Sequence, residues 1–142
     1  MIAYFDSSAL VPMTLNEAGT SRAVSVWLAA ERVVTSRITY AEVRAALAAA
    51  VRAGRTSSRD RDALVADLDR LIVDVDLVEV TDHLVRQAGE LCDQLGLRGC
   101  DAIQVASAVA VESDALVLVA GDRSLLEAGR RLGMLTVDTM PS

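Results

Sequence analysis

Four acidic residues, far apart in the sequence, each follow a short apolar run and lie at the start of a stretch with helical character. They are Asp6 after IAYF, Glu42 in the segment after RVVT, Asp101 at the start of DAIQVASAVAV, and Asp122 after ALVLVAG. In a parallel α/β sheet, the turns from strand to helix lie along the edge formed by the carboxyl ends of the strands, where such folds keep their sites. We therefore expect the four carboxylates to converge. Because converging carboxylates repel one another, this arrangement indicates divalent cations that neutralise them.

The elements that must position these residues alternate along the chain. Short apolar runs predict strands over residues 2–5, 32–35, 76–80, 115–119 and 134–137. Helical spacing predicts helices over 7–13, 20–30, 39–53, 58–73, 82–95, 101–112 and 123–132. This alternation favours an α/β fold, a single domain over residues 1–142, in which a short parallel β-sheet is flanked by helices on both faces. The two tandem helices before the third strand are an elaboration whose outer faces are candidates for a partner or dimer contact.

The composition bounds the class of protein. The 142 residues are 52% hydrophobic, and the mean hydropathy of +0.34 argues against disorder. The N-terminus lacks the pattern of a signal peptide, and no run approaches the ~20 apolar residues of a membrane span, which predicts a cytoplasmic protein without a membrane partner. All fourteen basic residues are arginine, and the net charge of −6 disfavours broad binding to nucleic acid but suits a basic protein partner.

Several other chemistries are excluded by what the chain lacks. His83 is the only histidine, so catalysis by a Ser-His-Asp or Cys-His arrangement is disfavoured, because no other histidine could act as its base. Cys92 and Cys100 form neither a disulfide framework nor a zinc signature. There is no phosphate-binding loop and no dinucleotide-binding glycine turn. A phosphoacceptor receiver domain would need a lysine, and a haloacid-dehalogenase-like phosphatase would need a second aspartate at position 8, which is Ser8.

Each acidic position also has a purely structural explanation. Asp6, Asp101 and Asp122 fit cap or first-turn positions of the helices that follow them. The segment from Thr39 to Glu42 has the pattern of a capping box, with Thr39 as the cap. The two explanations are compatible, because a helix N-terminus also lowers the cost of holding negative charge. By contrast, a solvated helix face explains the acidic residues of one charged helix, Asp60, Asp62, Asp67 and Asp69.

Four blocks of the chain together resemble one family. YFDSSALV, ITYAEV, LRGCDAIQVASAVA and VAGDRSLLEAGRRLG occur in the order found in PIN-domain ribonucleases, and they are most similar to the toxins of the VapBC toxin–antitoxin type. The resemblance runs over essentially the whole chain. It implies a compact α/β domain whose acidic residues hold Mg²⁺, with Mn²⁺ as a substitute, and cleave RNA. It also implies the toxin component of a type II toxin–antitoxin system, a homodimer or larger complex that a small VapB-like antitoxin holds inactive.

The family's site residues fall on positions of this sequence. Its four acids fall on Asp6, Glu42, Asp101 and Asp122, and its small hydroxyl residue falls on Ser8, which is positioned to bond a water molecule or an acidic ligand. We expect Asp6 and Asp101 to be the principal metal ligands, with Glu42 and Asp122 binding a second ion or orienting water. Hydrolysis by this route leaves 5′-phosphate and 3′-hydroxyl ends.

Some positions depart from the family or stay open. Many relatives have histidine where this chain has Gln104, and we expect little consequence of that difference. Arg98 and Arg123, together with Arg130 and Arg131, are candidate phosphate contacts, although surface arginines near helix ends explain them equally well. Two alternatives remain for the function. In the first, the chain is a catalytically silent binding protein of the same fold. In the second, it is a PIN nuclease outside any toxin–antitoxin system.

Overall fold

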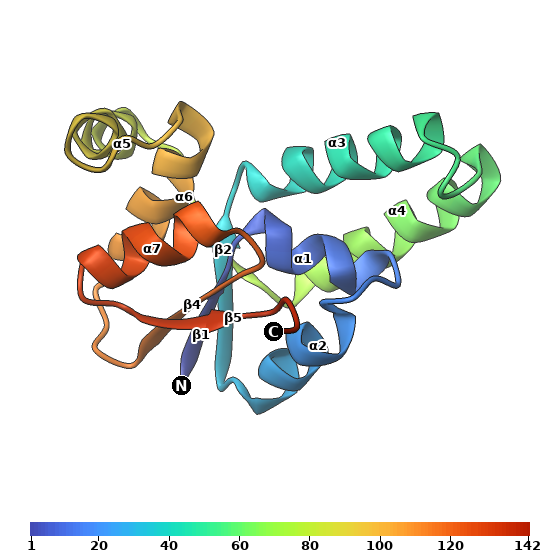
Figure 1. Ribbon diagram of the computed structural model, residues 1–142, viewed down its shortest axis with the longest axis horizontal. Coiled ribbons are helices and arrows are strands. Elements are labelled where there is room, and N and C mark those ends of the chain that lie inside the picture. Colours follow the sequence, from blue (N-terminus) through green and yellow to red (C-terminus); the bar gives the residue numbers. More distant parts are fainter.

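Five parallel strands form one sheet at the centre of the protein. The computed structural model describes residues 1–142, and Figure 1 shows the sheet between two groups of helices. The strand order is β3-β2-β1-β4-β5, and every neighbouring pair is parallel, which confirms the predicted α/β class. The strands are β1 (Ile2–Phe5), β2 (Arg32–Ser36), β3 (Asp76–Val78), β4 (Leu116–Ala120) and β5 (Leu135–Asp138).

Helices cover both faces of this sheet. One group packs on one face and consists of α1 (Ser7–Thr14), α2 (Thr20–Ala29), α3 (Thr39–Arg52) and α4 (Ser58–Val73). The other group consists of α5 (Asp82–Leu95), α6 (Gly99–Val109) and α7 (Arg123–Arg131). The tandem helices α3 and α4 pack against each other and extend away from the sheet (Figure 1). No helix is long and apolar enough to cross a membrane.

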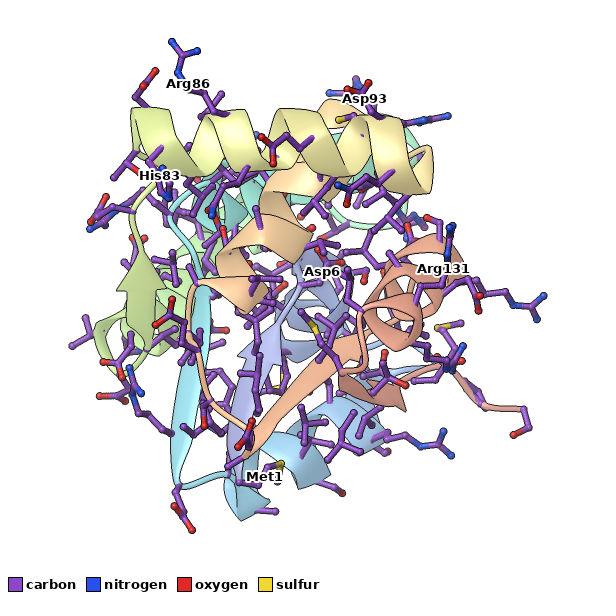
Figure 2. All side chains as sticks on the ribbon, turned by 90° about the vertical axis from the view of Figure 1, so that its left-hand side faces the viewer. Met1, Asp6, His83, Arg86, Asp93 and Arg131 are labelled. Atoms are coloured by element: carbon purple, nitrogen blue, oxygen red, sulfur yellow. The ribbon has the colours of Figure 1, made fainter.

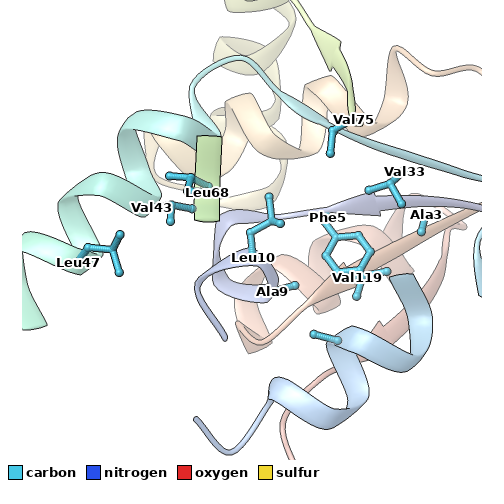
Figure 3. Close-up of a cluster of buried hydrophobic side chains, with 11 residues drawn as sticks. Ala3, Phe5, Ala9, Leu10, Val33, Val43, Leu47, Leu68, Val75 and Val119 are labelled. Carbon is cyan, nitrogen blue, oxygen red and sulfur yellow. The ribbon is translucent and has the colours of Figure 1, made fainter. Parts of the chain in front are cut away.

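The core is divided by the sheet because successive side chains of a strand point to opposite faces. Ala3 and Phe5 of β1 belong to the cluster under α1–α4, which Figure 3 shows, whereas Tyr4 belongs to a cluster on the other face. The rings of Phe5 and Trp27 pack edge to face at 5.6 Å. This packing on both faces fixes the register of β1 and with it the direction of the residue that follows, Asp6.

The boundaries of the elements agree with the predicted ones to within three residues. Gly96 ends α5 in the left-handed conformation, at φ 66°, which a residue without a Cβ adopts at little cost. The largest differences are at β3, which ends at Val78, and at α6, which spans Gly99–Val109 rather than 101–112. Because α6 begins early, Asp101 lies inside its first turn and not at its cap.

The acidic residues of α4 lie on the surface, as predicted, and so does the lone histidine. Asp60, Asp62, Asp67 and Asp69 are all exposed, and two of them pair with arginines of the same helix. His83 is exposed on α5, where Figure 2 shows it on the outside of the protein.

Candidate active site

Three strand-to-helix connections and the start of one further helix hold the four predicted acids; Asp101 departs from the predicted pattern, because its helix α6 follows the helix α5 and not a strand. Asp6 follows β1, Glu42 lies in the first turn of α3 after β2, and Asp122 follows β4. Asp101 enters from the first turn of α6, a helix that packs beside β2. We call these four residues the carboxylate edge. The charge of Glu42 raises the pKa of Asp6, that of Asp101 raises the pKa of Glu42, and that of Asp122 raises the pKa of Asp101, so successive members of the set are near enough to affect one another.

Asp6 is the most deeply buried of the four. Only 4% of it is exposed, and its Oδ2 caps α1 by accepting hydrogen bonds from the backbone N–H of Ser8 (3.1 Å) and from the Ser8 hydroxyl (2.5 Å). The Ser8 hydroxyl also accepts a bond from the backbone N–H of Gly121, at 2.9 Å. Ser8 therefore ties the end of β1 to the end of β4 and orients one oxygen of Asp6, leaving Oδ1 without a hydrogen-bond partner.

Asp122 repeats this arrangement one strand away. Its Oδ1 caps α7 by accepting bonds from the N–H groups of Ser124 and Leu125 and from the Ser124 hydroxyl. Its Oδ2 makes no hydrogen bond within the protein. In both aspartates, capping and site building coexist, because one oxygen serves the helix and the other stays free.

Glu42 is held by a residue whose importance the sequence did not indicate. Gln104 of α6 donates from Nε2 to Glu42 Oε1 (2.5 Å) and to the Thr39 hydroxyl (2.9 Å), and its Oε1 accepts a bond from the Tyr4 hydroxyl (2.6 Å). Gln104 is 1% exposed, and Tyr4 and Thr39 are fully buried. Burial raises the pKa of Tyr4, so its phenol remains a neutral donor. The network thus fixes Glu42 from below the sheet edge. The one local signal was a polar side chain in the mostly apolar run of α6, which did not identify the partners of Gln104.

The predicted capping box of α3 is wrong. Ile38 occupies the N-cap position and makes no side-chain cap, while the backbone N–H of Glu42 bonds to the Ile38 carbonyl within the helix. The Thr39 hydroxyl is engaged by Gln104 and by Thr35 (2.8 Å) instead of by the helix N-terminus. Hydrogen bonds of the buried polar network engage both Thr39 and Glu42, so neither side chain caps α3. Glu42 therefore remains available to the site.

Burial and mutual repulsion raise the pKa of three of the four carboxyl groups of the carboxylate edge. Burial raises the pKa of Asp6 to about 6, the hydrogen bonds from Ser8 oppose that rise, and the charge of Glu42 adds to it. Burial likewise raises the pKa of Glu42, which Gln104 lowers and Asp101 raises further. Burial raises the pKa of Asp101 as well, with Asp122 adding to the rise and Arg98 opposing it.

The donor set fits a hard divalent cation. All four side chains offer carboxylate oxygens, and both cysteines and the histidine lie outside the set. No three acidic, cysteine or histidine side chains are grouped so that they could hold a metal ion together. Mg²⁺ does not require three such ligands, since it is usually bound through one or two carboxylates and keeps several waters. The unengaged oxygens of Asp6 and Asp122 are suited to that role.

One prediction concerns pH and stability. The pKa of Asp6 is higher in the folded protein than in the unfolded chain, so its stabilising contribution is complete below about pH 4 and is lost as the pH rises to about 6. We expect Asp6→Asn, which carries no such charge, to raise the free energy of unfolding at pH 7.5 by about 2–3 kcal/mol in the absence of divalent ions. The gain over wild type should shrink toward pH 4.5. Urea denaturation at both pH values with chelator present measures it, and a difference between the two proteins that is independent of pH would contradict the assignment.

The other predicted site residues divide into near and distant ones. Arg98 occupies the N-cap position of α6, and its charge acts on Asp101. Arg123 is the first residue of α7, next to Asp122, and is exposed. Arg130 and Arg131 lie at the opposite end of α7, about 12 Å farther along the helix axis, and Arg130 pairs with Glu127. The predicted phosphate role therefore remains open for Arg98 and Arg123, while the geometry disfavours it for the other two.

Comparison with known proteins agrees with this geometry. Residues 3–130 match the PIN domain family. Ribonuclease VapC45 from Mycobacterium tuberculosis (strain CDC 1551 / Oshkosh) is 37% identical over 124 residues, which cover 87% of this chain and 86% of the relative. Among solved structures, VapC20 from Mycobacterium tuberculosis, described as a sarcin-ricin loop cleaving toxin, has a TM-score of 0.68 at 23% identity and covers 89% of this chain and 95% of its own.

A toxin–antitoxin complex has the same fold. VapBC2 from Rickettsia felis, solved with a DNA fragment from its promoter, gives a TM-score of 0.66 at 14% identity over 97% of this chain and 98% of the other. The solved structures agree in fold, and the sequence match covers most of the chain, including all four residues of the carboxylate edge. The protein therefore belongs to the PIN domain family.

Proposed function

We propose that this protein is a metal-dependent endoribonuclease, the toxin component of a type II toxin–antitoxin system. The observation that carries the proposal is the carboxylate edge, in which four acids from distant segments act on one another and keep carboxylate oxygens free of protein partners. The 37% identity to a protein named a ribonuclease supports RNA as the substrate.

Each residue of the carboxylate edge has a role in this proposal. Asp6 and Asp101 would be the principal ligands of Mg²⁺ or Mn²⁺, and Glu42 and Asp122 would complete the site or orient water. The bound ion supplies positive charge that activates water and offsets the charge on the departing 3′ oxygen. Ser8 and Gln104 orient Asp6 and Glu42, so the two carboxylates are held in place before substrate binds.

The proposed regulation is by a small antitoxin in the cytoplasm. The likeness to a VapBC complex supports a partner of that class. Complementary charge supports it as well, because the carboxylate edge and a net charge of −6 favour a segment with basic residues. We include a homodimer in the proposal, and light scattering of the purified protein with and without its antitoxin tests it.

Divalent ions are expected to stabilise the folded protein through the carboxylate edge. A ligand that binds only the folded state stabilises it by about 2.7 kcal/mol at a hundred times its Kd, which shifts the Tm by several degrees for a domain of this size. We expect Mg²⁺ or Mn²⁺ to raise the Tm of wild type, Asp101→Asn to lose most of the shift, and chelator to reverse it. Asp93→Asn, an exposed acid on α5 (Figure 2), is the control that keeps the shift. An equal shift in Asp101→Asn would contradict the ligand assignment whatever the activity.

A further inference from the structure

A cavity opens beside the carboxylate edge, on the side of β5. It has a volume of about 420 Å³ and is lined by Arg22 of α2, by Gly121 and Arg123, and by the segment after β5 that includes Met140. Gly121 and Arg123 flank Asp122 in the sequence, so the cavity begins where the carboxylate edge ends. We call it the arginine cleft.

One glycine separates the arginine cleft from the buried part of the site. The backbone N–H of Gly121 donates to Ser8, which in turn orients Asp6. A Cβ at position 121 would lie 3.0 Å from the Thr139 hydroxyl and 3.3 Å from the Ser8 carbonyl, so a larger residue would strain this wall. The arginine cleft therefore shares Gly121 with the hydrogen bonds that orient Asp6.

The two arginines of the arginine cleft form no salt bridge with an acidic side chain. Seven of the fourteen arginines pair with a carboxylate, namely Arg32, Arg37, Arg55, Arg61, Arg70, Arg86 and Arg130. Arg22 instead donates from Nη1 to the backbone carbonyls of Asp138 (3.0 Å) and Met140 (3.3 Å), which fixes its guanidinium without cancelling its charge. Arg123 has no partner in the protein. Asp138 is the one acidic side chain that lines the cleft; its carboxylate accepts a bond from the backbone N–H of Met140 and forms no salt bridge with either arginine, so the cleft has two guanidinium groups and one side-chain carboxylate.

A second polar group next to Arg22 also lacks a partner. The Thr139 hydroxyl is 1% exposed and is the one buried side-chain oxygen without a hydrogen bond. Thr139 and Arg22 both line a neighbouring cavity of about 460 Å³. Guanidinium groups that form no salt bridge and keep unused N–H donors are suited to a phosphate, whose oxygens match the planar fork of arginine.

The position of the arginine cleft beside the carboxylate edge indicates which phosphate-bearing ligand it would bind. An RNA strand whose scissile phosphate lies at the carboxylate edge must pass a concentration of negative charge in a protein of net charge −6. Positive charge beside that edge offsets the repulsion and fixes the path of the strand. We propose that Arg22 and Arg123 bind a phosphate of the RNA backbone adjacent to the scissile one; this inference rests on the proposed nuclease function.

The test is the salt dependence of RNA binding by the full-length chain. A short fluorescein-labelled single-stranded RNA is titrated with protein carrying Asp101→Asn, which prevents cleavage, between about 50 and 200 mM NaCl. We expect Arg123→Ala and Arg22→Gln each to weaken binding by about 3- to 10-fold at low salt and to reduce the slope of log affinity against log salt by about 0.7. Arg131→Ala is the matched control, because this unpaired arginine lies at the far end of α7 (Figure 2), and it should leave the slope unchanged.

Arg22 also anchors the C-terminal segment, so charge and anchoring must be separated. Arg22→Lys keeps the charge, and we expect it to keep the full salt slope, whereas Arg22→Gln loses part of it while still able to donate to the carbonyls. If Arg123→Ala and Arg22→Gln both had the same salt slope as Arg131→Ala while the wild-type protein still cleaved RNA, the proposed phosphate site would be wrong. The proposed nuclease function would still stand. Absence of both cleavage and RNA binding in wild type would overturn the two proposals together.

Discussion

Replacing Asp101 with asparagine is expected to abolish RNA cleavage while the protein remains folded. The substitution keeps the shape of the side chain and removes one charge from the carboxylate edge, where Asp101 makes no hydrogen bond that the fold depends on. Stabilisation of the transition state by a metal is worth several kcal/mol, and each 1.4 kcal/mol is about tenfold in rate, so we expect kcat/KM to fall by at least about 10³-fold.

The stability of this variant should change in the opposite direction to its activity. Burial and Asp122 raise the pKa of Asp101, so the charged carboxylate is disfavoured in the fold and its removal stabilises the ion-free protein at neutral pH. Cleavage assays and thermal unfolding of wild type, Asp101→Asn and the exposed control Asp93→Asn distinguish a site effect from a folding effect. Cleavage by Asp101→Asn at the rate of wild type would show that Asp101 is not a ligand.

The second large effect is expected at Gln104. Gln104→Leu removes three hydrogen bonds from a buried network and leaves the Tyr4 hydroxyl without an acceptor. Each buried polar group left unpaired costs about 1–3 kcal/mol, so we expect the free energy of unfolding to fall by about 2–4 kcal/mol. Because Glu42 loses its fixed donor, cleavage should fall by about 10- to 100-fold, as is usual when an outer partner of a metal ligand is removed.

A double-mutant cycle separates these two consequences. Tyr4→Phe removes the hydroxyl that Gln104→Leu leaves unpaired, so the double variant should lose less stability than the sum of the single ones. Cleavage by the double variant should stay low, since Glu42 is still without its donor. Gln94→Leu, at an exposed position of α5, is the control for the change of residue type. If Gln104→Leu retained the cleavage rate and metal affinity of wild type, Gln104 would have no positioning role.

Local patterns were sufficient to predict most of the fold. The apolar run of β1 and the helix over residues 82–95 depend only on neighbouring residues, and both were found where expected. Asp6 and Asp122 were identifiable for the same reason, because each directly follows a strand and begins a helix.

What the sequence did not reveal depends on contacts between distant segments. Gln104 meets Tyr4 across 100 residues and Glu42 across 62, and no local pattern encodes such a pairing. For the same reason Thr39 seemed to be a cap, although the buried network of Gln104 and Thr35 engages its hydroxyl instead. Arg22 joins the segment after β5 from more than a hundred residues away, so the arginine cleft was visible only in the folded protein.

The chemistry of the RNA ends tests the central claim most directly. Purified, antitoxin-free protein is incubated with total cellular RNA and Mg²⁺, beside Asp101→Asn and a sample with chelator, and the ends of the fragments are mapped. A nuclease that uses the carboxylate edge and a divalent ion is expected to make discrete cuts with 5′-phosphate and 3′-hydroxyl ends, absent in both controls. Fragments that end in 2′,3′-cyclic phosphate, or cuts that persist with chelator, would contradict it.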